Sequence, residues 1–103
     1  KLISRLRWTI SQIKQVFVDI CFLGSDGFQI LTALQVASSD VFIDREIIKQ
    51  ADKAYILADS SKFERKSLYK ICDWSDITAL ITDSDADEAK CLNIGKQTKV
   101  ILS

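Results

Sequence analysis

The chain has 103 residues, of which 48% are hydrophobic and 27% charged, and these values exclude a disordered segment and fit one compact globular domain. Its 14 basic and 14 acidic residues leave no formal net charge. A basic face for nucleic acid is therefore not expected, and DNA is not the partner of this segment itself.

The apolar runs are far shorter than the roughly 18 to 20 residues that cross a bilayer. Nothing at the start resembles a signal peptide, so we expect a soluble, cytoplasmic protein without membrane contact. The chain has no histidine, and Cys21, Cys72 and Cys91 form no Cys-x-x-Cys pair. We expect buried or half-buried free thiols, and neither a metal nor another cofactor. Trp8 and Trp74 are expected to pack in a core or an interface.

The start of the chain fits two arrangements. Arg5–Trp8 alternates between polar and apolar residues as a strand does. Helical spacing is shown instead by Leu2, Leu6, Ile10, Ile13 and Phe17. We favour a short strand near Arg5–Trp8, followed by a helix from about Ser11 to Phe17. A start at Lys1 rather than at methionine fits a fragment or a processed product.

Four continuous apolar runs rich in β-branched residues predict strands at Val18–Leu23, Ala54–Ala58, Thr78–Thr82 and Lys99–Leu102. Unbroken hydrophobicity is typical of a parallel sheet that is covered on both faces. The segments between the runs carry helical signals, and the chain has no internal repeat. The pattern predicts an α/β fold, with an open, mostly parallel, Rossmann-like sheet flanked by helices.

Two helices are predicted between these strands. The first covers Asp40–Ala51, with caps offered by Ser38-Ser39-Asp40. The second covers about Asp85–Asn93, capped by Ser84 or Asp85 and stopped by Gly95.

Polar clusters follow the first three apolar runs: Gly24-Ser25-Asp26-Gly27, Asp59-Ser60-Ser61-Lys62 and Asp83-Ser84-Asp85. The carboxyl ends of parallel strands share one edge of a sheet, which is where open α/β sheets bind ligands. We therefore expect the side chains of Asp26, Asp59, Lys62 and Asp83 to converge. Carboxylates accept hydrogen bonds from sugar hydroxyls, while a lysine and free backbone N–H groups favour phosphate, so a sugar phosphate is the predicted ligand.

Each cluster also has a purely structural interpretation. Asp26-Gly27 is typical of a tight turn, and Asp59-Ser60-Ser61 of a cap beside a solvated Lys62. Asp83-Ser84-Asp85 is typical of a helix cap. The basic stretch from Lys62 to Lys70 is interrupted by an acidic residue, which favours a solvated loop over a nucleic-acid surface.

Three segments together resemble a known family: Val18–Gly27, Ala51–Phe63 and Ser75–Asp83. In order and spacing they resemble the C-terminal sensor domain of DeoR-type bacterial transcriptional regulators, over about Phe17 to Asp83. That resemblance implies a fold similar to ribose-phosphate isomerase, glucosamine-phosphate deaminase and the CoA transferases. The ligand-binding residues that it implies are Gly24, Asp26, Gly27, Asp59, Ser61 and Lys62.

The resemblance also implies a function: a phosphorylated sugar effector would control DNA binding by a winged helix-turn-helix, and the protein would form homo-oligomers. That DNA-binding module and the first strand and phosphate loop of such sensors have no counterpart here. Residues 1–103 are therefore expected to be the C-terminal part of a sensor, touching DNA only through the absent module.

Two departures from the family pattern bear on the ligand. Val36-Ala37-Ser38 replaces an acidic start, and Asp44 stands where a lysine is common. Gly27 stands where the related isomerases have a second carboxylate, so an enzyme is not expected. A sugar-phosphate isomerase-like enzyme and a pure oligomerisation module remain the alternatives.

Overall fold

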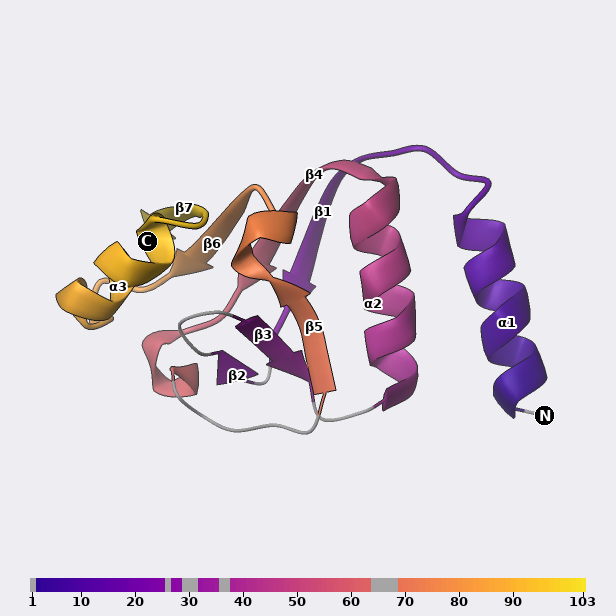
Figure 1. Ribbon diagram of the computed structural model, residues 1–103, viewed down its shortest axis with the longest axis horizontal. Coiled ribbons are helices and arrows are strands. Elements are labelled where there is room, and N and C mark those ends of the chain that lie inside the picture. The colour runs from indigo at the N-terminus through magenta and orange to yellow at the C-terminus, as the bar shows by residue number, and fades with distance from the viewer. Residues whose placement is uncertain (1, 26, 29–31, 36–37, 64–68) are drawn as a thin grey trace.

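The computed structural model describes residues 2–25, 27–28, 32–35, 38–63 and 69–103, which form two sheets and three α-helices (Figure 1). The parallel sheet has the order β1-β4-β6-β7, and its strands are β1 (Val18–Gly24), β4 (Ala51–Leu57), β6 (Ala79–Thr82) and β7 (Lys99–Leu102). The antiparallel sheet has the order β2-β3-β5, and its strands are β2 (Gly27–Phe28), β3 (Thr32–Gln35) and β5 (Tyr69–Asp73). The predicted α/β class and the parallel sheet are confirmed.

All four predicted strands are present: Lys99–Leu102 has the predicted bounds, and the other three strands have shifted ends. β4 begins at Ala51, a residue predicted to end the preceding helix, because the chain passes directly from helix into strand. Thr78 lies just before β6: its N–H donates to the Ala54 carbonyl at 2.8 Å, and its Oγ1 accepts from the Ala54 N–H at 3.1 Å. The hydrogen bonding between β4 and β6 thus extends one residue before β6, with the Thr78 side chain as the acceptor.

The first residues form helix α1 (Leu2–Ile13), so the predicted strand at Arg5–Trp8 is wrong. A four-residue alternation also fits a helix, and the longer helical spacing decides between them. The predicted helix from Ser11 to Phe17 is present only in its first residues, and Phe17 is 98% exposed. Trp8 is also exposed, whereas Trp74 is fully buried as predicted. α1 packs against α2 at one end of the molecule (Figure 1).

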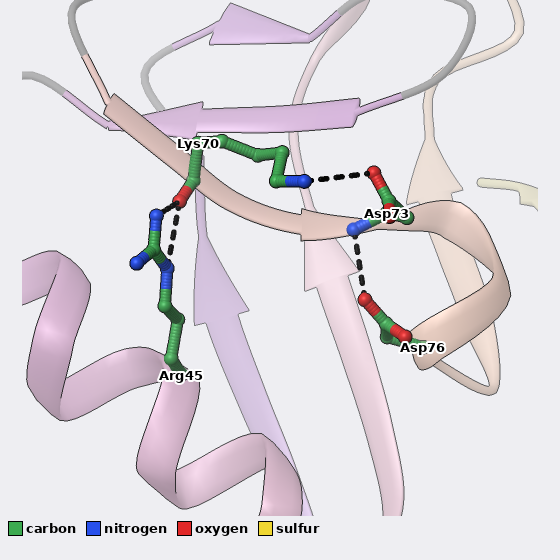
Figure 2. Close-up of polar contacts among 4 residues, drawn as sticks. All are labelled: Arg45, Lys70, Asp73 and Asp76. Atoms are coloured by element: carbon green, nitrogen blue, oxygen red, sulfur yellow. Dashed lines mark hydrogen bonds and ion pairs between the residues drawn. The ribbon is translucent and has the colours of Figure 1, made fainter.

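Helix α2 (Ser38–Gln50) packs against both sheets: against β1 and β4 of one, and against β3 and β5 of the other. Arg45 of α2 holds β5 directly. Its Nε and Nη2 donate to the Lys70 carbonyl at 3.0 and 2.5 Å (Figure 2). The Lys70 ammonium in turn lies 3.4 Å from the Asp73 carboxylate, and the Asp73 N–H donates to Asp76 at 3.0 Å.

The antiparallel sheet was not predicted. Tyr69 and Lys70 lie in β5, so the solvated-loop interpretation is wrong for this end of the basic stretch, and residues 64–68 lie outside the described residues. The sheet is held by a buried aromatic pair: the Phe28 ring meets the Trp74 ring edge-on, at 6.0 Å between centroids. Phe28 and Trp74 belong to the same buried cluster as Ile56 of the parallel sheet, so the two sheets share one core.

Helix α3 (Glu88–Gly95) connects β6 to β7. Its N-cap is Asp87, whose carboxylate accepts from the Lys90 N–H at 3.0 Å, so the predicted caps at Ser84 and Asp85 are wrong. Gly95 is the last helical residue instead of the residue after the helix.

The three cysteines are free thiols, as predicted: Cys21 and Cys72 are buried, and Cys91 is half-buried. Burial raises the pKa of the Cys21 and Cys91 thiols, so both stay protonated near neutral pH. No described helix is long and apolar enough to cross a membrane.

Candidate functional site

An open cavity of about 800 Å³ lies at the carboxyl edge of the parallel sheet, where β1, β4 and β6 end. Helix α2 forms part of its wall. Its lining residues are Phe22, Leu23, Gly24, Ser25, Ile43, Asp44, Leu57, Ala58, Asp59, Lys62, Ile81, Thr82, Asp83 and Ser103. The cavity therefore lies at the edge where the sequence predicts a ligand.

The predicted convergence is seen for the side chains that the structure describes. Gly24, Asp59, Lys62 and Asp83 all line the cavity, and Asp26 lies outside the described residues. A ligand role for these residues stays a prediction.

Two further predicted residues lie beside the cavity and do not line it. Gly27 is in β2, where its carbonyl accepts from the Ser25 hydroxyl at 2.5 Å. Ser61 is exposed, and its hydroxyl donates to the Asp59 carboxylate.

A short 3-10 helix, η1 (Ser60–Lys62), follows β4 and carries Lys62 to the cavity. Asp59 is its N-cap, and one carboxylate oxygen accepts from the Ser61 N–H at 3.0 Å. The Lys62 N–H donates to the Asp59 carbonyl, also at 3.0 Å. The interpretation of Asp59 as a cap is thus correct, and the turn that it caps also sets the position of Lys62.

Asp83 fastens this turn to the end of β6. Its Oδ2 accepts from the Ser60 N–H at 2.8 Å, and its Oδ1 accepts from the Asp85 N–H at 3.0 Å. Hydrogen bonds from the Ser60 N–H, and then from the Ser60 hydroxyl, lower the pKa of the Asp83 carboxyl, which favours its ionised form. Asp83 therefore joins two strand ends and does not cap the helix that follows.

The backbone N–H groups of η1 are consequently all used within the protein: those of Ser60, Ser61 and Lys62 donate to Asp83, Asp59 and Asp59 respectively. Our expectation of free N–H groups for a phosphate is wrong for this turn. The reason is that the Asp83 and Asp59 carboxylates take the first two N–H groups and the Asp59 carbonyl takes the third.

The charges around the cavity are unequal. Among the described lining residues there are three carboxylates, Asp44, Asp59 and Asp83, and a single cation, Lys62. Within the described part of the chain, the Lys62 ammonium makes no ion pair or hydrogen bond. This amine is therefore free to meet an anionic group, while the carboxylates suit hydroxyl donors.

Several lining residues were missed by sequence reasoning. Gly24, Leu57 and Ile81 stand in register on three neighbouring strands. Phe22 lies two residues before Gly24, so its side chain shares the face of Leu57 and Ile81. That face follows from the two-residue period of the predicted strands. Ile43 and Asp44 come from α2. The family pattern had already marked Asp44 as a departure that bears on the ligand, whereas nothing in the local sequence indicates that Ile43 reaches the cavity.

Comparison with known proteins agrees with this architecture. The family described as the DeoR C terminal sensor domain matches residues 5–84. The chain belongs to this family. All three motifs of the predicted resemblance lie inside the match, which extends back beyond Phe17 to Arg5 and so includes most of α1.

Two relatives of this DeoR-type sensor are named as transcriptional regulators. The chain is 33% identical over 66 residues to a candidate aga operon transcriptional repressor of Escherichia coli O157:H7, covering 63% of this chain and 24% of that protein. It is 29% identical over 73 residues to the uncharacterized HTH-type transcriptional regulator YulB of Bacillus subtilis strain 168, covering 70% and 28%. The matched part spans about a quarter of each relative's length.

Proposed function

We propose that this DeoR-family sensor binds a phosphorylated sugar in the cavity at the carboxyl edge of its parallel sheet. The observation that carries the proposal is the composition of the site: among its described lining residues, Lys62 supplies the one ammonium, which has no described partner, beside three carboxylates. Lys62 meets the anionic group of the ligand, and the carboxylates accept its hydroxyls. In this proposal Gly24, Asp26, Gly27 and Ser61 complete the ligand-binding edge, as the family resemblance implies.

We propose further that residues 1–103 are the C-terminal part of the sensor of a cytoplasmic repressor of sugar-metabolism genes. In the whole protein, effector binding shifts a winged helix-turn-helix between DNA-competent and DNA-incompetent states. The relatives are named as a transcriptional repressor and an HTH-type regulator, and this favours a sensor over an isomerase-like enzyme. A fold relationship to the sugar-phosphate isomerases belongs to the same proposal.

Self-association is also part of the proposal. One face of the parallel sheet leaves large apolar side chains exposed: Ile20 at 51%, Phe22 at 58% and Leu57 at 42%. Burial of such a patch between copies would be favourable. Sedimentation of the domain at high concentration is expected to show oligomers, and a well-behaved monomer would contradict this part of the proposal.

The ligand is tested on the full-length regulator. A thermal-shift screen with phosphorylated hexoses, pentoses and ketoses is expected to find a compound that raises Tm, because a ligand of the folded state stabilises it. Calorimetry with that compound should show binding weakened by about 1.5 to 3 kcal/mol in Lys62→Ala. Asp26→Asn should also impair the response, since an amide replaces an acceptor-only carboxylate.

The matched control is Lys53→Ala, which removes an exposed lysine of β4 that does not line the cavity. It should leave the affinity unchanged. Operator binding should survive in all three variants. An unchanged dissociation constant for Lys62→Ala would mean that this lysine is only a solvated loop residue.

A further inference from the structure

Thr82 combines burial, a place on the cavity wall and a hydroxyl that has no partner in the part of the chain that the structure describes. It is the last residue of β6, it lines the cavity, and it is 3% exposed. Its carbonyl accepts from the Ser103 N–H at 2.9 Å, but among the described residues its Oγ1 has no hydrogen-bond partner. Buried hydroxyls are almost always hydrogen-bonded, because an unpaired one has lost water and gained nothing.

The other threonines at the ends of these strands behave differently. Thr98 is 8% exposed, and its Oγ1 donates to the Ile77 carbonyl at 3.1 Å. Thr78 accepts from the Ala54 N–H through its Oγ1 at 3.1 Å. Both lie at the amino edge of the parallel sheet, outside the lining of the cavity. The unpaired hydroxyl therefore lies at the ligand edge and the paired hydroxyls lie at the opposite edge.

We propose that Thr82 Oγ1 is a specificity-determining group that hydrogen-bonds a neutral hydroxyl of the effector. This inference rests on the proposed function and adds a residue and a chemical preference to it. The neighbouring cavity wall carries the carboxylates of Asp44, Asp59 and Asp83, which repel a phosphate. The phosphate goes to Lys62, and Thr82, which both donates and accepts, takes a sugar hydroxyl.

If the hydroxyl binds the effector, its removal should raise Tm, whereas removal of a hydroxyl that supports the fold should lower Tm. In the ligand-free protein the unpaired Oγ1 is destabilising, so Thr82→Val, which keeps the branched shape and removes the hydroxyl, should raise Tm. The same change should weaken effector binding. A hydroxyl that only supports the fold would lower Tm on removal and leave the affinity unchanged.

The experiment uses the full-length regulator as wild type, Thr82→Val and the matched control Thr98→Val. Thr82→Val is expected to raise Tm of the ligand-free protein by about 2 °C or more. Thr98→Val removes a satisfied hydroxyl outside the cavity, so its Tm should fall and its affinity should stay at the wild-type value. Calorimetry is run with glucose 6-phosphate, fructose 6-phosphate and ribose 5-phosphate, the matching free sugars, and inorganic phosphate.

Thr82→Val should bind each sugar or sugar phosphate that wild type binds about tenfold more weakly, which is a difference of 1.4 kcal/mol in binding free energy. Single-deoxy analogues of that compound locate the contact. One deoxy analogue should bind wild type more weakly than the parent compound does. Thr82→Val should bind that analogue and the parent compound equally, because the protein hydroxyl that would contact the missing ligand hydroxyl is already absent. Inorganic phosphate should bind both proteins equally.

The outcomes separate this inference from the proposed function. If wild type binds sugar phosphates and Thr82→Val binds them equally well, or if its Tm falls, the role of Thr82 is overturned and the sensor proposal stands. If wild type binds free sugars and no phosphate, the phosphorylated effector is overturned and Thr82 is still tested by the deoxy analogues. If wild type binds none of the compounds, both proposals fall.

Discussion

The two sheets of the domain use their charged side chains differently. At the edge of the parallel sheet, Asp59 and Asp83 hold a turn that brings Lys62 to a cavity, where its amine has no ion pair with any described residue. On the antiparallel sheet, Lys70 pairs with Asp73, and both are bound to neighbouring residues of the same surface. The parallel sheet thus presents charge to a ligand, whereas the antiparallel sheet uses charge to hold itself in place.

Helix α2 connects these two regions through consecutive residues. Ile43 and Asp44 line the cavity, and Arg45, the next residue, donates to the Lys70 carbonyl of β5. The helix that forms one wall of the cavity is thus bound to the antiparallel sheet, and we expect the placement of that wall to depend on this contact. Each prediction below separates the two regions or tests this dependence.

The largest expected effect comes from the shared core. Trp74→Ala, in the antiparallel region, and Leu80→Ala, in the parallel sheet, should each lower the free energy of unfolding by about 3 to 5 kcal/mol, because both side chains are fully buried. Trp8→Ala, at an exposed position, should change it by less than about 0.5 kcal/mol.

Thermal unfolding followed by far-UV circular dichroism and by tryptophan fluorescence tests whether the sheets unfold together. One core predicts coincident transitions in wild type and in Leu80→Ala. Two separated transitions would show that the antiparallel sheet unfolds as an independent unit.

The second prediction concerns how Asp83 acts. Removing its carboxylate in Asp83→Ala frees the turn that carries Lys62, so effector binding should weaken about tenfold, or 1.4 kcal/mol. If Asp83 acts by positioning Lys62, the same change should cost little in a Lys62→Ala background, because coupled residues are not additive. Calorimetry of wild type, Asp83→Ala, Lys62→Ala and the double variant measures this double-mutant cycle.

Asp87→Ala is the matched control for Asp83→Ala. It removes the N-cap of α3 away from the cavity, so it should lower stability by about 1 kcal/mol and leave the affinity unchanged. Additive effects of Asp83→Ala and Lys62→Ala would mean that Asp83 touches the effector itself or acts through another residue.

The sequence predicted the parallel sheet because its strands carry their own signal. Ala54–Ala58 and Thr78–Thr82 contain no charged residue, and the position of the aspartate that follows each run is given by the run alone. That is why Asp59 and Asp83 were placed correctly at the cavity. The order and direction of the strands then required only general rules of connection.

The antiparallel sheet could not be predicted in this way. β2 is two residues long, and β5 pairs with β3, which is distant in the chain, so the pairing depends on tertiary contacts such as Phe28 against Trp74. The hydrogen-bond partners of the site could not be predicted from the sequence either. No local pattern shows that Asp83 accepts from the Ser60 N–H or that Thr82 Oγ1 has no described partner.

The third prediction tests the link between the two regions. Arg45→Ala removes two hydrogen bonds to the Lys70 carbonyl at an exposed site, and should lower stability by about 1 kcal/mol. Arg45→Lys should not restore the loss, because an ammonium lacks the planar fork that holds one acceptor with two nitrogens. Chemical denaturation measures both.

Lys49→Ala, on the same helix, serves as the control for Arg45→Ala and should have an effect below about 0.5 kcal/mol. Effector affinity is the sharper measurement, since Arg45 does not line the cavity. A loss of affinity in Arg45→Ala supports a cavity wall that depends on β5. An unchanged affinity would mean that α2 holds that wall without the antiparallel sheet.

The smallest expected effect is a pH dependence confined to the ligand edge. Because hydrogen bonds from Ser60 lower the pKa of Asp83 below its ordinary value of 3.8, the folded state binds the proton less tightly than the unfolded chain does. The stability that this carboxylate contributes is therefore complete above pH 3.8 and is lost as the pH falls through the lowered pKa. An NMR titration of the Asp83 carboxyl carbon should give a midpoint below 3.8, and the Ser60 amide proton should shift with the same midpoint as its acceptor is neutralised. In Asp83→Asn the Ser60 shift should not follow pH in this range, and a wild-type midpoint at or above 3.8 would show that the tether between β6 and η1 does not persist in solution.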